Sequence, residues 1–303
     1  MAISRGQLVK ELEPGLNALF GLEYKQYENQ HAEIYTTESS DRAFEEEVML
    51  SGFAQAQTKS EGAGVAFDNA QETFTARYTH ETVALAFSIT EEAIEDNLYD
   101  RLASRYTKAL ARSMAQTKQV KAVNPLIQGL PTTDNYDSGD GVSLFNTAHP
   151  TIAGTVANTL ATQADLNETS LEQSLIDIAA MTDERGLRIA ARGLKMIIPS
   201  ELQFTAERLM KSQGRTGTAD NDINAIVSMG MIPQGYRVNN YLTDSDAYYI
   251  LTDIPNGMKM FNRAPLTTAM EGDFDTGNVR YKARERYSFG VSDPRGIFGV
   301  EGA

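Results

Sequence analysis

Side chains that commonly act as metal ligands or catalytic groups are few and widely spaced in this sequence of 303 residues. There is no cysteine, so disulfide bonds and thiolate metal sites are excluded. The three histidines, His31, His80 and His149, stand far apart and form no HExxH or other paired ligand spacing. Each is interpreted as a surface or structural histidine, and we predict neither a metal site nor a cofactor.

Acidic side chains also lack the spacing of a known site. Asp134, Asp137 and Asp140 follow D-x-x-D-x-x-D-G, which misses the EF-hand pattern, so an acidic surface turn is the favoured interpretation. The P-loop lysine and the G-x-S-x-G serine are absent. The sequence therefore predicts a protein that is not an enzyme, with an α/β hydrolytic enzyme that uses an unrecognised carboxylate site as one alternative.

The most regular set of charges is basic. Arg101, Arg105, Lys108 and Arg112 follow the spacing i, i+4, i+7, i+11, which places them on one narrow stripe of a helix. The whole chain carries a net charge of −14 at pH 7, which argues against a general nucleic-acid coat. This basic stripe is therefore either the solvated back of a core helix or a surface with a partner.

A single long helix is predicted to carry the stripe, from Glu91 to Val123. The run of about 33 residues has no Gly or Pro inside and would be roughly 50 Å long. Ser88 and Glu91 form a capping-box pattern at its start, and Asn124-Pro125 is expected to end it. Its apolar side is predicted from residues that lie opposite the stripe: Tyr99, Ala103, Tyr106, Leu110, Met114 and Thr117.

A long β-hairpin is predicted just before this helix. Apolar and polar residues alternate over 73–80 and again over 82–89, while 55–64 is small and polar with two glycines. An isolated hairpin is marginal in water, so we expect a partner to supply its missing contacts. The expected contact residues form the tip of the hairpin: Thr58, Lys59, Ser60, Glu61, Gly62 and Gly64.

The two ends of the chain differ in pattern. Residues 7–24 predict a short amphipathic helix interrupted by Pro14 and Gly15, within an arm that becomes ordered on a neighbour's surface or stays an extended leader. Downstream, a capping box at Thr169 opens a helix that ends near Gly186. Further elements are expected as a strand at 194–198, a helix to Lys211, strands at 236–238, 248–252 and 258–261, and a long last strand from 279.

The order of these elements resembles the major capsid protein of tailed phages, the Hong Kong 97-type fold. Local strings add to the likeness to head subunits of the Mu-like group, and they lie at 144–150 (LFNTAHP), 181–186 (MTDERG), 195–202 (KMIIPSEL) and 284–296. The resemblance implies an α+β fold made of four parts. These are an N-terminal arm (1–43), an extended hairpin called the E-loop (44–86), a peripheral domain with the long spine helix (87–130 and 253–303) and an axial domain (131–252).

The resemblance also implies a function. It is that of a major capsid protein that self-assembles into hexamers and pentamers, forming an icosahedral shell around phage double-stranded DNA. The implied location is the virion capsid, assembled in the bacterial host cytoplasm. An encapsulin-type compartment shell of the same fold is a second alternative.

The partners follow from the same resemblance. Because only about 43 residues precede the hairpin, a separate scaffolding protein is expected, together with a portal and possible decoration proteins. The spine helix is expected to face the shell interior, so the basic stripe either contacts packaged DNA non-specifically or pairs with acidic groups of the arm. No apolar run approaches the length of a membrane span.

Overall fold

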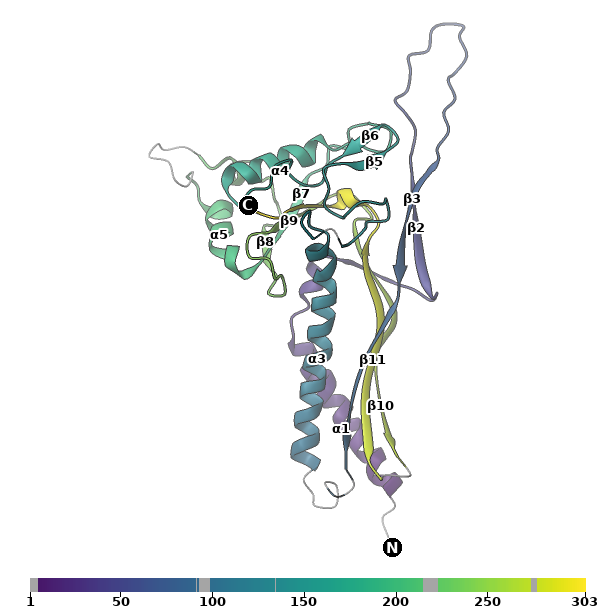
Figure 1. Cartoon of the computed structure of the whole chain (residues 1–303), viewed down its shortest axis with the longest axis vertical. Coiled ribbons are helices and arrows are strands. Elements are labelled where there is room, and N and C mark those ends of the chain that lie inside the picture. Colours follow the sequence, from purple (N-terminus) through teal and green to yellow (C-terminus); the bar gives the residue numbers. More distant parts are fainter. Residues whose placement is uncertain (1–4, 91, 93–98, 134, 215–222, 274–276) are drawn as a thin grey trace.

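The computed structural model describes residues 5–90, 92, 99–133, 135–214, 223–273 and 277–303. Figure 1 shows an elongated molecule with a helix-and-strand stalk, a mixed α/β head and a hairpin that projects past the head. The expected α+β class is confirmed. Side chains of residues 5–12 and 99–102 lie outside the description.

The stalk is a four-stranded sheet covered on one face by two helices. Its strand order is β1-β10-β11-β4, with β10 and β11 paired antiparallel over most of their length. The strands are β1 (Thr36–Ser39), β4 (Glu81–Ile89), β10 (Met258–Gly272) and β11 (Val279–Val291). The helices are α1 (Arg5–Gln26) and α3 (Tyr99–Gln128). Leu16 and Phe20 of α1 pack with Leu110 and Met114 of α3 against Tyr281 of β11.

The head is a second four-stranded sheet, of order β12-β9-β7-β8, with helices packed on it. Its elements are β7 (Gly193–Ile198), β8 (Tyr236–Val238), β9 (Tyr248–Thr252), β12 (Ile297–Val300), α4 (Glu168–Ala180), α5 (Gln203–Lys211) and α6 (Ala225–Met229). Short connections are η1 (Gln30–Glu33), β5 (His149–Thr151), β6 (Gly154–Val156), η2 (Ser200–Leu202) and η3 (Pro294–Gly296). A third apolar cluster, which includes Tyr35, Leu126 and Phe145, joins the head to the stalk.

The projecting hairpin consists of β2 (Phe44–Leu50) and β3 (Glu72–Thr79), paired antiparallel. It was expected from the alternation in this region and is confirmed. The strand at 82–89 was also predicted correctly, but as β4 it pairs with β11 in the stalk sheet.

Two features of the stalk helices differ from the sequence prediction, the end of one helix and an interruption in the other. In both, tertiary packing overrides the local signal. The spine helix does not end at Asn124-Pro125 but continues through Pro125 to Gln128. Leu126 and Leu130 are buried there, which favours continuing the helix over the cost of one lost hydrogen bond. Likewise α1 is continuous through Pro14. The predicted start of the spine helix, at 91 and 93–98, lies outside the described residues.

The capping prediction for α4 was close but shifted. The N-cap is Asn167, whose side chain accepts the Ser170 backbone N–H while Ser170 Oγ accepts that of Asn167. The helix ends at Ala180, six residues before Gly186. An irregular turn with the Thr182–Arg188 bridge follows, so the expected end at Gly186 was wrong.

Candidate assembly interface

The loop that joins β2 to β3 contains all the predicted tip residues, and residues 52–70 are exposed throughout. The end of the loop is a turn in which the Ala63 N–H donates to the Ser60 carbonyl oxygen, 3.1 Å away. Gly62 occupies the third position of this turn with φ of 77°, a left-handed conformation that favours glycine. The small, polar hairpin tip expected from the sequence lies at this turn, whereas the function of the tip residues stays a prediction.

The same loop exposes apolar side chains that the sequence reasoning missed. Phe67 is 97% exposed, and Phe53 and Val65 are 61% and 67% exposed. Burying one such side chain on a partner is worth about 1.5–3 kcal/mol, whereas an exposed ion pair made by Lys59 or Glu61 is worth roughly 0–1 kcal/mol. One feature of the sequence could have indicated this exposure: Phe67 is an aromatic residue in a polar loop and has no apolar neighbours at strand or helix spacing.

The base of the hairpin is firmly attached to its own subunit. Ala76, Tyr78 and Phe261 form a small buried cluster, and the Tyr78 hydroxyl is hydrogen-bonded to Ser292 Oγ. The expectation that the flanking strands lack an intrasubunit core is therefore wrong for the base. For the loop between the strands the expectation agrees with the structure, because residues 52–70 are exposed.

Lys259 of β10 holds three segments together at this base. Its Nζ lies 2.5 Å from Glu47 Oε1 on β2 and 3.2 Å from Glu38 Oε1 on β1. The lysine side chain is only 8% exposed. Burial acts to lower its pKa, but the hydrogen bonds that its ammonium donates to the two carboxylates outweigh this and raise the pKa of Lys259. This charge cluster fixes the direction in which the hairpin leaves the stalk.

All three histidines are buried and structural. His80 lies between β3 and β4, where its Nε2 donates to Ser40 Oγ, which in turn donates to Glu45 Oε1. On the other side of the ring, Ser288 Oγ donates to Nδ1 at 2.9 Å. Burial lowers the pKa of His80, so the ring is neutral at neutral pH. The surface interpretation was wrong and the structural one holds.

His149 organises the loop that carries the LFNTAHP string. Its Nδ1 lies 2.6 Å from Asp140 Oδ2, and its Nε2 faces Leu144 O and Asn158 Oδ1. Burial acts to raise the pKa of Asp140, but hydrogen bonds from His149 and Ser138 outweigh it and leave this pKa lowered. Asp140 is thus a buried structural partner and not part of an exposed acidic turn. Asp134 lies outside the described residues, and those described contain no group of His, Cys, Asp or Glu suited to holding a metal ion.

The described part of the basic stripe lies on the exposed side of α3. Arg105, Lys108 and Arg112 are exposed, while Ala103, Leu110 and Met114 are buried as predicted. Lys108 Nζ lies 3.8 Å from Glu23 Oε2 of α1, the expected kind of pairing with the arm. Among the described residues no side-chain partner is found for Arg105 or Arg112, and the side chain of Arg101 lies outside the description. Tyr106 was placed on the apolar side but is 51% exposed.

The N-terminal segment belongs to the core of its own subunit. Phe20 is 2% exposed, and Asn17 Oδ1 accepts hydrogen bonds from Tyr281 and Thr268 of the stalk sheet. The expectation of an arm that needs a neighbour's surface, or of an extended leader, is wrong for residues 13–39. The amphipathic helix finds its apolar partner on α3 and β11 instead.

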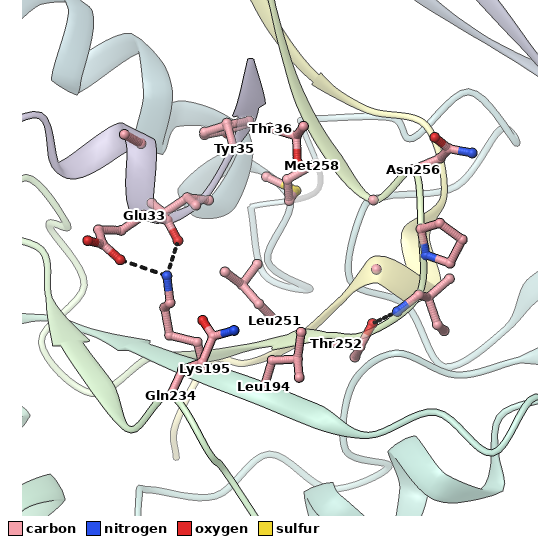
Figure 2. A pocket seen from close by; sticks show the side chains of 16 residues that line it. Glu33, Tyr35, Thr36, Leu194, Lys195, Gln234, Leu251, Thr252, Asn256 and Met258 are labelled. Carbon is pink, nitrogen blue, oxygen red and sulfur yellow. Dashed lines mark hydrogen bonds and ion pairs between the residues drawn. The ribbon is translucent and has the colours of Figure 1, made fainter. Parts of the chain in front are cut away.

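A pocket of about 300 Å³ lies where the segment after α1 meets the head sheet and the β9–β10 turn. Figure 2 shows Lys195 reaching from β7 to Glu33, where its Nζ donates to the backbone oxygen at 3.1 Å and to Oε2 at 2.6 Å. The hydrogen bond from Lys195 is the main cause that lowers the pKa of Glu33. Thr36, Gln234, Thr252 and Asn256 add polar side chains to the lining, but no further acidic or basic residue joins them. The arrangement therefore ties stalk to head and offers no acid–base pair for catalysis beyond this ion pair.

Comparison with known proteins decides the family. Residues 72–300 match the family described as phage capsid protein. The chain belongs to the phage capsid protein family. No match was found among curated protein sequences. The described part of the chain holds no helix with the length and apolar character that crossing a membrane requires.

Solved capsid structures share the fold at low sequence identity. The virus-like particle from Pyrococcus furiosus is 10% identical with a TM-score of 0.54, over 95% of this chain and 98% of that one. The capsid of Myoviridae phage XM1 is 11% identical with a TM-score of 0.53, over 89% of both chains. The capsid of an empty GTA particle is 13% identical with a TM-score of 0.53, over 90% of this chain and 89% of that one. Such likeness shows the fold alone, and it confirms the expected Hong Kong 97-type capsid fold.

The family match confirms the expected function of a major capsid protein, a structural component of a phage virion. An encapsulin-type compartment is not better supported, since the matching family is that of phage capsids.

Proposed function

We propose that the phage capsid subunit described above assembles into hexamers and pentamers of an icosahedral shell that encloses double-stranded DNA. The observation that carries this proposal is the exposed hairpin loop in a chain of the phage capsid family. In the loop at 51–71 Phe67 is almost fully exposed, although Arg185 of the head contacts Asp68 and Asn69 of the same loop. Exposed apolar side chains on an extended loop are typical of a contact that forms on assembly.

In this proposal the loop tip contacts a neighbouring subunit, and the basic stripe contacts DNA. Thr58–Gly64, including Lys59 and Glu61, lies across an adjacent subunit. Arg105 and Arg112 of α3, with Arg101 on the same stripe, face the packaged DNA and bind phosphates without sequence preference. The exposure of Arg105 and Arg112 supports this division, as does the pairing of Lys108 with Glu23, the one ion pair found for the described side chains of the stripe.

The proposed division into parts follows the boundaries expected from the sequence, except that β4 (Glu81–Ile89) belongs to the stalk sheet and β12 (Ile297–Val300) to the head sheet. These are an arm at 1–43, the E-loop at 44–86, a peripheral domain at 87–130 and 253–303, and an axial domain at 131–252. The proposed partners are a separate scaffolding protein, a portal and decoration proteins, with assembly in the host cytoplasm. The separate sheets of stalk and head support the distinction between peripheral and axial domains.

Sedimentation velocity and electron microscopy of the purified full-length chain, produced with and without a co-expressed scaffolding protein, test this function. We expect closed particles of megadalton mass with hexameric and pentameric units. A chain that remains a small oligomer under both conditions would contradict the proposal. Particles that carry host protein cargo and no DNA after phage infection would instead favour a compartment shell.

A further inference from the structure

The turn between β9 and β10 holds the only Asn-Gly pair of the sequence, Asn256-Gly257. Pro255 and Asn256 form the centre of this turn, and Asn256 has φ of 61°, a left-handed conformation. The Asn256 side chain is exposed, and its amide has no hydrogen-bond partner among the described residues. Figure 2 shows it on the opposite side of the pocket from Lys195 and Glu33. The amide is therefore open to water and is not held in one orientation by the protein.

The glycine that follows leaves the backbone nitrogen accessible to this amide. Any other residue at 257 would carry a Cβ beside that nitrogen, and glycine has none. The nitrogen and the side-chain carbonyl carbon, Cγ, belong to adjacent residues, so attack closes a five-membered ring within one chain. An intramolecular step of this kind is favoured because the two reacting groups are already held close together. The reaction needs no catalytic side chain.

We propose that Asn256 is a site of spontaneous deamidation. The deprotonated Gly257 nitrogen forms a bond to Asn256 Cγ, the bond from Cγ to Nδ2 breaks, and Nδ2 leaves as ammonia with protons taken from water. Water then adds to one of the two carbonyl carbons of the succinimide ring. Cleavage of the bond from nitrogen to Cγ gives aspartate. Cleavage of the bond from nitrogen to the main-chain carbonyl carbon gives isoaspartate, whose main chain is longer by one carbon. No oxidant or reductant takes part.

The place of the turn in the fold gives isoaspartate a structural effect. Gly257 lies against the backbone of η3, where a Cβ built on Gly257 would be 2.8 Å from Gly296 Cα. The Gly257 carbonyl oxygen accepts the Ser292 N–H at 3.0 Å. The next residue, Met258, is 5% exposed in the apolar cluster that joins head to stalk. An extra main-chain carbon just before this contact has to move one backbone relative to the other. Deamidation should therefore weaken the joint between head and stalk as the protein ages.

Mass spectrometry of the full-length chain tests the modification. Trypsin releases residues 238–259 as one peptide, which carries Asn256 together with Asn239 and Asn240. Asn240 is exposed like Asn256 but precedes Tyr241, so it is a matched control within the same peptide. After incubation of the folded protein at pH 9, we expect one amide-to-acid mass increase, located at Asn256, and less of it at pH 6 because attack needs the deprotonated nitrogen. Labelling by an isoaspartyl methyltransferase should detect the longer product.

Three results of this experiment would overturn the proposal. The first is an unmodified Asn256, and the second is equal conversion of Asn240. The third is conversion only in urea-unfolded protein, because the native turn would then protect the amide. Conversion to aspartate without any isoaspartate would indicate direct hydrolysis by water and would overturn the ring-closing step.

The variant Asn256→Gly tests the effect on the joint. Glycine suits the left-handed backbone at this position and removes the reacting amide. Freshly prepared, the variant and the wild type should unfold at similar temperatures. After the same incubation the Tm of the wild type should fall in step with its isoaspartate content, and that of the variant should stay unchanged. An equal Tm for both in spite of conversion would overturn the weakening of the joint. These measurements use the unassembled subunit, so a failure of the proposed shell would leave them unaffected.

Discussion

Lys118 of α3 and Glu285 of β11 form an ion pair 3.1 Å long inside the stalk, with exposed fractions of 14% and 2%. Burial raises the pKa of Glu285, and the Lys118 charge only partly offsets this. A carboxyl whose folded pKa lies above its unfolded value stabilises the fold at low pH. That contribution is lost as pH rises through the folded pKa.

Lys118→Met should therefore destabilise the subunit strongly near neutral pH. Removing one partner of a buried pair typically costs about 3–5 kcal/mol because the other charge remains buried. The deficit should shrink as pH falls through the folded pKa of Glu285, which lies above the unfolded value of about 4.3, because the buried carboxyl then becomes protonated. Urea unfolding at pH 8 and pH 5 measures this. The double variant Lys118→Met with Glu285→Leu is the control, and equal deficits at both pH values would indicate lost packing instead.

His31 gives an acid-dependent prediction of the opposite sign. Its backbone N–H donates to Gln119 Oε1, so the Gln119 amide N–H faces and donates to His31 Nδ1, 3.0 Å away. Burial, aided by the Lys118 charge, lowers the pKa of His31 to about 4. Stability should be lost as pH falls from the unfolded value of about 6.5 through the folded value. His31→Gln should flatten this part of the stability–pH curve, measured by unfolding at pH 7 and 4.5. An unchanged slope would show that other groups cause the acid sensitivity.

At the scale of elements, α1 is the segment whose role differs most from the sequence expectation. Phe20 is 2% exposed between α3 and β11, whereas Leu22 on the same helix is 65% exposed. Phe20→Ala should lower the free energy of unfolding by about 3–5 kcal/mol. The matched Leu22→Ala change should stay within about 0.5 kcal/mol, because it removes an exposed side chain. If both variants unfold like the wild type, α1 is not part of the subunit core in solution.

How much of the structure was predictable depends on whether a segment's packing is local. The alternation of β11 was readable because Tyr281 and Ala283 face one buried side while their neighbours face solvent. The helix end at Pro125 was not, because Leu126 and Leu130 are held by residues distant in sequence. The continuity of α1 through Pro14 likewise depends on α3 and β11. Local signals predicted the elements, and long-range contacts fixed their ends.

The same distinction applies to the candidate interface. The glycine-tipped loop was visible from composition, since Gly62 and its neighbours are small and polar. Phe67 was missed because its exposure depends on how the loop is placed relative to the head, which the local sequence does not indicate.

For the whole molecule, the salt dependence of DNA release should depend on the basic stripe of α3. Arg105→Ala with Arg112→Ala should leave particle mass unchanged and increase the release of DNA as salt is raised, because phosphate contacts depend strongly on ionic strength. The control, Arg208→Ala with Lys211→Ala, removes the same charge from α5 in the head. DNA release as a function of salt, followed by ultraviolet absorbance of pelleted particles, measures the effect. Identical release from both variants would show that the basic stripe does not face DNA.

The hairpin loop should matter to the shell and not to the isolated subunit. Replacing Thr58–Gly64 by an Asn-Gly turn removes only exposed residues, so the free energy of unfolding should change by less than about 0.5 kcal/mol. Each lost contact is weak alone, but every copy in a closed shell is held by several neighbours at once, so the yield of particles should collapse. Phe67→Ser should reduce yield more than Lys59→Ala, since burying an aromatic ring contributes more than an exposed ion pair. Thermal unfolding of the unassembled subunit and sedimentation of particles give the two readouts. A shortened subunit that unfolds would make the loop an internal structural element, and one that assembles normally would remove the hairpin from the interface.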